Sequence, residues 1–123
     1  MKRIYLHSSD NEKISVLERL CGEQKIEIHI LRESDINRTL AAICGVKMES
    51  GRTPVKAPVL YGLPELLIFF GMDDKGLDLF LDAYNRSGVE KIQRKAVITP
   101  TNLGWSLYEL AEELGKESAL NKQ

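Results

Sequence analysis

Four times along the 123-residue chain, a short apolar run is followed by a segment whose apolar residues recur at helical spacing. The apolar runs lie at about 3–8, 25–31, 65–71 and 95–99. Strands that alternate with helices usually pair in parallel, with helices covering both faces of the sheet. Four such units are too few to close an eight-stranded barrel. The pattern therefore predicts an open, three-layer α/β sandwich.

The second and third apolar runs differ in pattern, and this difference predicts their places in the sheet. Residues 65–72, ELLIFFGM, are apolar on both faces, as expected for a central strand covered on both sides. Residues 25–32, KIEIHILR, alternate apolar and polar side chains, which is typical of an edge strand. We expect one α/β domain over residues 1–123, with a mostly parallel sheet in the flavodoxin-like order 2-1-3-4. We also predict that all four strands run parallel.

The segment between the second helix and the third strand breaks this rhythm. Residues 47–64, KMESGRTPVKAPVLYGLP, contain three prolines and two glycines, which exclude a regular helix. The sequence predicts a long irregular loop, and loops of this length inside a compact domain are often mobile or functional. The second helix is expected over 34–46, with Ser34 or Asp35 as its cap, and Ser9 is expected to cap the first helix.

Charge and cysteine content exclude several classes of protein. With 17 basic and 18 acidic residues, the chain lacks the positive excess that holds a phosphate backbone, so we expect no nucleic-acid partner. The longest apolar run, 66–72, is too short to cross a membrane, and the N-terminal run is too short for a signal peptide. Cys21 and Cys44 have no CxxC spacing and fit buried, reduced thiols. A cytoplasmic protein without a membrane partner is expected.

The stretch KAVITPTNLGW, residues 95–105, and the acidic helix after it carry a recognisable pattern. The pattern consists of Lys95, Ala96, Val97, Thr99, Asn102, Trp105, Glu109, Leu110, Glu113 and Leu114. Together with LLIFFGMDDKGLDLFLDAYNRSG before it, this stretch resembles a small bacterial family of uncharacterised proteins. It is the domain-of-unknown-function family numbered thirty-seven eighty-three. The resemblance covers residues 65 to about 118 and implies no activity.

Part of this stretch is explained by helix capping alone. Ser106 and Glu109 have S-x-x-E spacing, which predicts a capping box at the start of the last helix. Trp105 precedes the cap and Leu110 lies at the fourth helical position, so the two are placed for a hydrophobic staple. A cap of this kind contributes about 1 kcal/mol. We interpret these four residues as structural.

Short polar residues follow the predicted strands, where open α/β sheets bind their ligands. The candidate ligand rim consists of Ser8, Ser9, Gly71, Asp73, Thr99, Thr101 and Asn102. If the strands are parallel, these residues share one edge of the sheet. Asn and Thr also shape turns by bonding to nearby backbone, and that use is the more common one.

Two chemical alternatives fit the sequence less well. Asp10 with Asp73 or Asp74 is similar to the magnesium pocket of response-regulator receivers, but the third strand ends in glycine and no fifth strand follows. The plain interpretation is that these acids complement helix N-termini. His7 and Ser8 are neighbours in a strand and point to opposite faces, so they form no catalytic pair. We therefore assign no catalytic, cofactor-binding or metal-binding residue.

The sequence leaves two functions open. The favoured one is a small, non-catalytic, cytoplasmic module that binds a partner, and the alternative is a small ligand or anion sensor, or a minor enzyme. In the alternative, the rim binds the ligand and the 47–64 loop acts as a lid. The partner would be a small molecule or a protein, and a homodimer is also left open.

Overall fold

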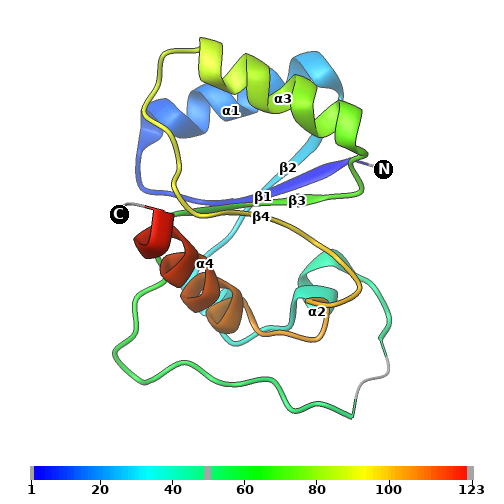
Figure 1. Ribbon diagram of the computed structural model, residues 1–123, viewed down its shortest axis with the longest axis vertical. Helices are drawn as coiled ribbons and strands as arrows, with labels where there is room; N and C mark the ends of the chain where they lie inside the picture. Colours follow the sequence, from blue (N-terminus) through cyan, green and yellow to red (C-terminus); the bar gives the residue numbers. More distant parts are fainter. Residues whose placement is uncertain (1, 49–50, 122–123) are drawn as a thin grey trace.

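The computed structural model of the protein describes residues 2–48 and 51–121 (Figure 1). In chain order, its elements are β1 (Arg3–His7), α1 (Asn11–Gln24), β2 (Glu27–Ile30), the 3-10 turn η1 (Glu33–Asp35), α2 (Leu40–Cys44), β3 (Leu66–Phe70), α3 (Asp74–Arg86), β4 (Lys95–Val97) and α4 (Leu107–Asn121). The described part of the 47–64 loop forms no helix or strand, as predicted.

The four strands form one open sheet in the predicted order β2-β1-β3-β4. β1 pairs with β2 and β3 pairs with β4 in parallel, so the sheet is mostly parallel. The central pair is different, because β1 and β3 are antiparallel, with Arg3 opposite Phe70 and His7 opposite Leu66. The prediction that all four strands run parallel is therefore wrong at this pair.

Over residues 31–48 and 51–65, the connection between β2 and β3 lacks the long helix that usually links parallel strands. A parallel crossover needs an element that carries the chain from one edge of the sheet to the other. The second helix was expected over 34–46, but α2 has five residues and spans about 7.5 Å, less than half of a five-residue strand. Its cap is Thr39, whose side chain accepts from the Ala42 amide, rather than Ser34 or Asp35. After α2, the chain returns along an irregular loop to the edge where β2 ended, and β3 begins there.

Helices cover both faces of the sheet, and each face has its own core (Figure 1). α1 and α3 lie on one face, where their apolar residues pack with Ile4, Leu6, Leu67 and Phe69. α4 and α2 lie on the other face and pack with Tyr5, Leu66 and Ile68. The alternation of side chains along β1 and β3 thus supplies both cores, as expected of central strands.

Candidate functional site

The predicted rim residues do not share one edge of the sheet. Because β1 and β3 are antiparallel, β1 ends beside the start of β3. Ser8 and Ser9 therefore lie at the edge where β3 and β4 begin, which we call the Ser8 edge. At the opposite Asn102 edge lie Gly71, Asp73, Thr99, Thr101 and Asn102. The expectation that Ser8, Gly71 and Asn102 lie at one edge is therefore wrong.

At the Ser8 edge, Ser8 belongs to an internal ion-pair network. Its hydroxyl donates to one oxygen of Glu65 (2.6 Å), and the Lys13 ammonium donates to the other (2.8 Å). The Lys13 side chain is only 7% exposed, and its hydrogen bond to Glu65 raises its pKa. A lysine held in its charged form is no base for Ser8. The network instead ties α1 to the start of β3.

His7 contacts the end of the long loop. Its Nδ1 lies 2.9 Å from the Pro64 carbonyl oxygen, and its Nε2 lies 3.9 Å from a Glu33 oxygen. No hydrogen bond among the described residues joins His7 to Ser8. The arrangement positions the loop and does not form a nucleophile–base pair.

The two acidic residues considered for a magnesium pocket cap different helices at opposite edges. Asp10 accepts from the amides of Glu12 (3.0 Å) and Lys13 (3.2 Å), so Asp10, not Ser9, caps α1. Asp73 accepts from the amide of Gly76 (2.7 Å) at the start of α3. Within residues 2–48 and 51–121, no three His, Cys, Asp or Glu residues are grouped closely enough to hold a metal ion.

At the Asn102 edge, both polar atoms of the Asn102 side chain form hydrogen bonds within the turn that contains this residue. Its Oδ1 accepts from the Thr99 amide (2.9 Å), and its Nδ2 donates to the Val97 carbonyl (3.0 Å). Asn102 is 8% exposed, whereas Thr101 is exposed. Asn102 therefore closes the end of β4 and leaves little of its amide for a ligand.

The next residues form the start of α4. The Ser106 amide donates to Glu109 (3.1 Å), and the Glu109 amide donates to the Ser106 hydroxyl (3.1 Å). These are the two reciprocal bonds of a capping box. Trp105 is half-buried and packs against the core cluster that contains Leu110.

The start of α4 is joined to the start of α2. Thr39 and Ser106 form an antiparallel bridge, with the Leu40 amide donating to the Trp105 carbonyl (2.9 Å). In return, the Leu107 amide donates to the Arg38 carbonyl (2.9 Å). The two bonds thus fix the starts of α2 and α4 relative to each other. We call these two helices, on one face of the sheet, the platform.

An irregular segment, residues 51–64, crosses this platform, and we call it the strap (Figure 1, green). The Glu109 carboxylate forms an ion pair with the Arg52 guanidinium and also accepts from the Val55 amide (2.8 Å). The Ser106 hydroxyl donates to the Val55 carbonyl (2.6 Å). The capping box of α4 is therefore also the anchor of the strap.

This anchor changes the acidity of Glu109. The hydrogen bonds from Arg52, together with those from the Val55 and Ser106 amides, lower the pKa of Glu109 from 4.5 to about 2. The side chain is 13% exposed, so little water competes for its oxygens. Glu109 is thus a charged hub at neutral pH.

Two further side chains hold the strap along its length. The Ala57 amide donates to Asn37 Oδ1 (2.8 Å), and the Leu63 amide donates to Glu33 Oε2 (2.9 Å). Asn37 and Glu33 both lie just before α2, so the first and second halves of the strap are held next to the same helix.

Between these anchors, the strap makes a turn that projects apolar side chains into water. The Tyr61 amide donates to the Pro58 carbonyl (3.0 Å), which closes the turn. At its tip, Val59 is 98% exposed and Leu60 is 96% exposed. We call residues 58–61 the strap turn. These two side chains are not buried, so they contribute no hydrophobic stabilisation to the folded chain.

Among the described residues, the strap and the body together line a small hollow. The hollow between them has a volume of about 160 Å³ and is lined by Arg52 and Pro54 from the strap and by Thr39 and Leu103 from the body. Ligand pockets usually have volumes of about 300 Å³ or more. A lid over a bound metabolite therefore fits this geometry poorly.

A polar groove of about 340 Å³ lies on the β1–β2 side, near the end of α2. Its floor is a stacked pair, Tyr5 and His29, with ring centres 5.2 Å apart. Arg3 donates to the Cys44 carbonyl (2.9 Å) and to Glu27 (3.2 Å), so its charge is already bonded within the chain. His29 is exposed on β2, an edge strand of the sheet.

Sequence reasoning missed the strap anchors and the strap turn. The anchors Glu33, Asn37 and Arg52 lie 20 to 57 residues from their partners, and no spacing rule reveals such bonds. The turn did leave a signal, because Val59 and Leu60 stand between Pro58 and Gly62 in a loop with no periodic pattern.

Comparisons with known proteins agree with the predicted resemblance. Within residues 2–48 and 51–121, no helix has the length and apolar character needed to cross a membrane. No curated protein and no solved structure matched the chain. A family model did match, over a segment that contains β3, α3, β4 and α4. Residues 65–120 match the family described as "Domain of unknown function (DUF3783)", which confirms both the family and the segment that the sequence pattern indicated.

Proposed function

We propose that the protein is a non-catalytic interaction module that binds a protein partner through the strap turn. The observation that carries this proposal is the nearly complete exposure of Val59 (98%) and Leu60 (96%) at the tip of an anchored segment. A single exposed apolar residue is ordinary, whereas contiguous exposed apolar surface marks interaction sites. Burial of these two side chains by a partner would contribute about 3 kcal/mol or more to binding.

The way in which the strap is held supports this function. Its backbone donates to side chains of the body at Val55, Ala57 and Leu63, on both sides of the turn. A segment that is already ordered loses less conformational entropy when it binds. The turn is thus presented to a partner in one conformation.

The surroundings of the turn indicate the chemistry of the partner. Lys56 is exposed two residues before the turn, and Val55 is 52% exposed. A partner with an apolar pocket and acidic residues at its border would complement this surface. A membrane is a poorer match, because the aromatic residue of the turn, Tyr61, packs against Tyr108 and the chain has a net charge of -1.

The alternative of a ligand sensor on the strand-end rim receives less support. Ser8 is bonded to Glu65, Asn102 is bonded within its turn, and the two lie at opposite edges. The cytoplasmic location is part of the proposal and is supported by two free, buried cysteines, Cys21 and Cys44. A bacterial origin rests only on the family resemblance.

A photo-crosslinking residue at position 60, compared with one at Ser15 on the exposed face of α1, tests the proposal in cells. We expect position 60 to capture a specific protein that position 15 does not. The captured protein is then purified and titrated against the native chain and against the Val59→Ser, Leu60→Ser double variant. We expect its affinity to fall about ten-fold or more.

Two results would contradict the proposal. One is an identical crosslinking pattern from positions 60 and 15. The other is binding of the double variant to the purified partner with unchanged affinity. Sedimentation with anionic vesicles forms a second arm, in which vesicle binding that depends on Leu60 would replace the protein partner with a membrane.

A further inference from the structure

The two edges of the sheet differ in whether a further strand can bind to them. At the β4 edge, Asn102 covers the outer backbone: its Nδ2 donates to the Val97 carbonyl (3.0 Å), and its Oδ1 accepts from the Thr99 amide (2.9 Å). β2 is the strand at the other edge, and within residues 2–48 and 51–121 no strand pairs with its outer side. An unpaired edge is a template for another strand, so β2 can accept one, whereas the β4 edge is blocked.

The bonds between β2 and its neighbour determine which backbone groups of β2 point outward. The Glu27 amide donates to the Lys2 carbonyl (3.0 Å), so the backbone of Glu27 faces the side of β1. Successive residues of a strand alternate in this direction. The amide and carbonyl groups of Ile28 and Ile30 therefore point away from the sheet, and the Ile30 side chain is exposed as well (48%).

The side chains of β2 are divided between its two faces. Glu27 and His29 lie on the face that carries α2, where Glu27 is bonded to Arg3 of β1 (3.2 Å). Ile28 and Ile30 lie on the opposite face, which carries α1 and α3. A strand added to this edge would meet polar side chains on one face and apolar side chains on the other.

A second β2 strand matches this edge when it runs antiparallel about a two-fold axis at Ile28. In that register, Ile28 lies opposite its own copy and Glu27 lies opposite His29 of the second copy. On the apolar face, Ile26 lies opposite Ile30 of the second copy. Directly opposite side chains share a face of the sheet and interact. Each polar residue thus meets a polar one, and each isoleucine meets an isoleucine.

The backbone groups fit the same register. The Ile28 amide of each copy would donate to the Ile28 carbonyl of the other, and the Ile30 amides would donate to the Ile26 carbonyls. The Ile26 amide is already bonded to the Cys21 carbonyl (2.9 Å), but the Ile26 carbonyl points outward, because the amide of the same peptide group faces β1. The pairing therefore uses donors and acceptors that point outward from the fold.

The polar face distinguishes this register from the adjacent one. With the axis at Ile28, each Glu27 carboxylate lies between Arg3 of its own chain and His29 of the second copy. With the axis at His29, the two imidazoles would lie opposite each other, and Glu27 would lie opposite Leu31. The carboxylate can accept a hydrogen bond from the imidazole in the first register, whereas like groups meet in the second.

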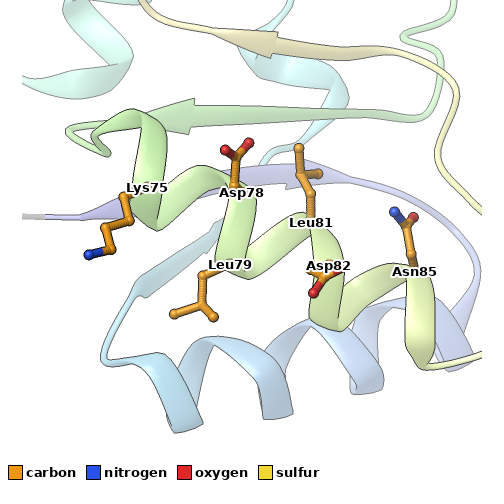
Figure 2. Close-up of a pocket in the computed structure, with 6 residues that line it drawn as sticks. All are labelled: Lys75, Asp78, Leu79, Leu81, Asp82 and Asn85. Atoms are coloured by element: carbon orange, nitrogen blue, oxygen red, sulfur yellow. The ribbon is translucent and has the colours of Figure 1, made fainter.

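The exposed surface of α3 is less suited to a second copy. Figure 2 shows its polar side chains, among them Lys75, Asp78 and Asn85, on a single helix, with Leu79 projecting toward the side of α1. The backbone groups inside a helix are bonded within that helix, so only side chains could hold a partner there. At β2, backbone and side chains can both contribute.

We propose that two copies of this chain pair through antiparallel β2 strands about a two-fold axis at Ile28 and form one continuous sheet. The proposal rests on the unpaired outer side of β2 and on the complementary positions of Glu27 and His29. A two-fold interface needs a patch that complements itself, with each contact occurring twice, and this register meets that condition. The pairing uses no residue of the strap turn, so it is independent of the proposed partner binding.

Sedimentation of the full chain over a range of concentrations tests this dimer. Ile30→Pro removes an outward amide, which an edge strand tolerates, and places the proline ring against the second copy. We expect the dissociation constant of the monomer–dimer equilibrium to rise about ten-fold or more. Val97→Pro, at the outer side of β4, is the matched control and should leave it unchanged. Ile30→Lys and Val97→Lys form a second matched pair that keeps the amide, and urea unfolding checks that all four variants remain folded.

Substitutions at His29 test the register. His29→Lys places a fixed positive charge opposite Glu27 of the second copy and should lower the dissociation constant several-fold, whereas His29→Glu should raise it several-fold. If the axis lay at His29, the lysines of the His29→Lys variant would lie opposite each other and weaken the dimer.

Four results would overturn the proposal. They are a chain that is monomeric at every concentration, a dimer that Ile30→Pro and Ile30→Lys both leave intact, and a dimer that His29→Lys weakens. The fourth is a dimer that is lost in Val59→Ser, Leu60→Ser, because the strap turn would then be the interface.

Discussion

The turn at 99–106 and the strap at 51–64 are both irregular, but they are held in different ways. In the turn, side chains bond to backbone three to five residues away, as Asn102 does with Thr99 and Val97. In the strap, backbone amides bond to side chains 20 to 54 residues away, as Val55 does with Glu109. The turn is therefore specified locally, whereas the strap depends on the rest of the fold.

The two segments meet at Ser106 and Glu109. Ser106 is fully buried, accepts from the Glu109 amide and donates to the Val55 carbonyl. A pair that was interpreted as a helix cap thus serves a second, long-range purpose. Substitutions at Glu109, which bonds to both segments, and at Asn102, which bonds within the turn alone, therefore test the two kinds of restraint.

Glu109→Ala is expected to have the largest effect, because it removes the cap and the strap anchor together. We expect the free energy of unfolding to fall by about 3 kcal/mol, since Arg52 and two amides lose a charged partner. Urea unfolding measures this loss, and Glu113→Ala, at an exposed position on the same helix, is the control. Equal losses in the two variants would contradict the role of Glu109 as a hub.

Hydrogen exchange of the strap shows which segment was released. In Glu109→Ala, the Val55 amide should exchange faster, because its acceptor is gone. The Thr99 amide, held by Asn102, should keep its protection. If both amides lost protection together, the turn and the strap would form one cooperative unit and not two.

Acid should loosen the strap before the turn. The pKa of Glu109 is lowered from 4.5 to about 2, so this residue stabilises the folded chain above pH 4.5, and that contribution is lost as the pH falls toward 2. Because Arg52 is 42% exposed, we expect a contribution of about 2 kcal/mol. Urea unfolding at pH 6 and pH 2.5 measures it against Glu109→Gln, whose acid dependence in this window should be smaller.

Asn102→Ala breaks the turn alone. Two hydrogen bonds of a side chain that is 8% exposed are lost, and we expect the free energy of unfolding to fall by about 1–2 kcal/mol. Thr101→Ala, at an exposed neighbouring position, is the matched control. Rapid exchange of the Val55 amide in Asn102→Ala would contradict the independence of the strap.

The same contrast explains what the sequence could predict. The capping-box pair, Ser106 and Glu109, follows from S-x-x-E spacing, and the order of the strands follows from the apolar patterns of 25–32 and 65–72. Each of these signals lies within one element. The family resemblance over 65–120 likewise depends on a contiguous stretch of sequence, which contains two strands, one turn and two helices.

The direction of β3 was not predictable in this way. The helix expected before β3 is shorter in the structure, because Thr39 caps α2 late and Gly45 ends it early, with a φ of 70° that favours glycine. α2 has five residues and is followed by an irregular loop, and β3 starts at the edge where β2 ends. The expectation that the rim residues share one edge is wrong because β3 runs antiparallel to β1, which places Ser8 and Asn102 at opposite edges.

The smallest effect is expected at the strap turn, and it separates the strap's anchored residues from its projecting ones. Val59→Ser with Leu60→Ser should change the free energy of unfolding by less than about 0.5 kcal/mol, because neither side chain is buried. Leu63→Ser, on the same strap but 5% exposed, should cost about 2–4 kcal/mol. Urea unfolding of the two variants gives this difference directly. A large loss in the Val59, Leu60 variant would mean that these side chains stabilise the chain itself, which would remove the main support for a partner-binding turn.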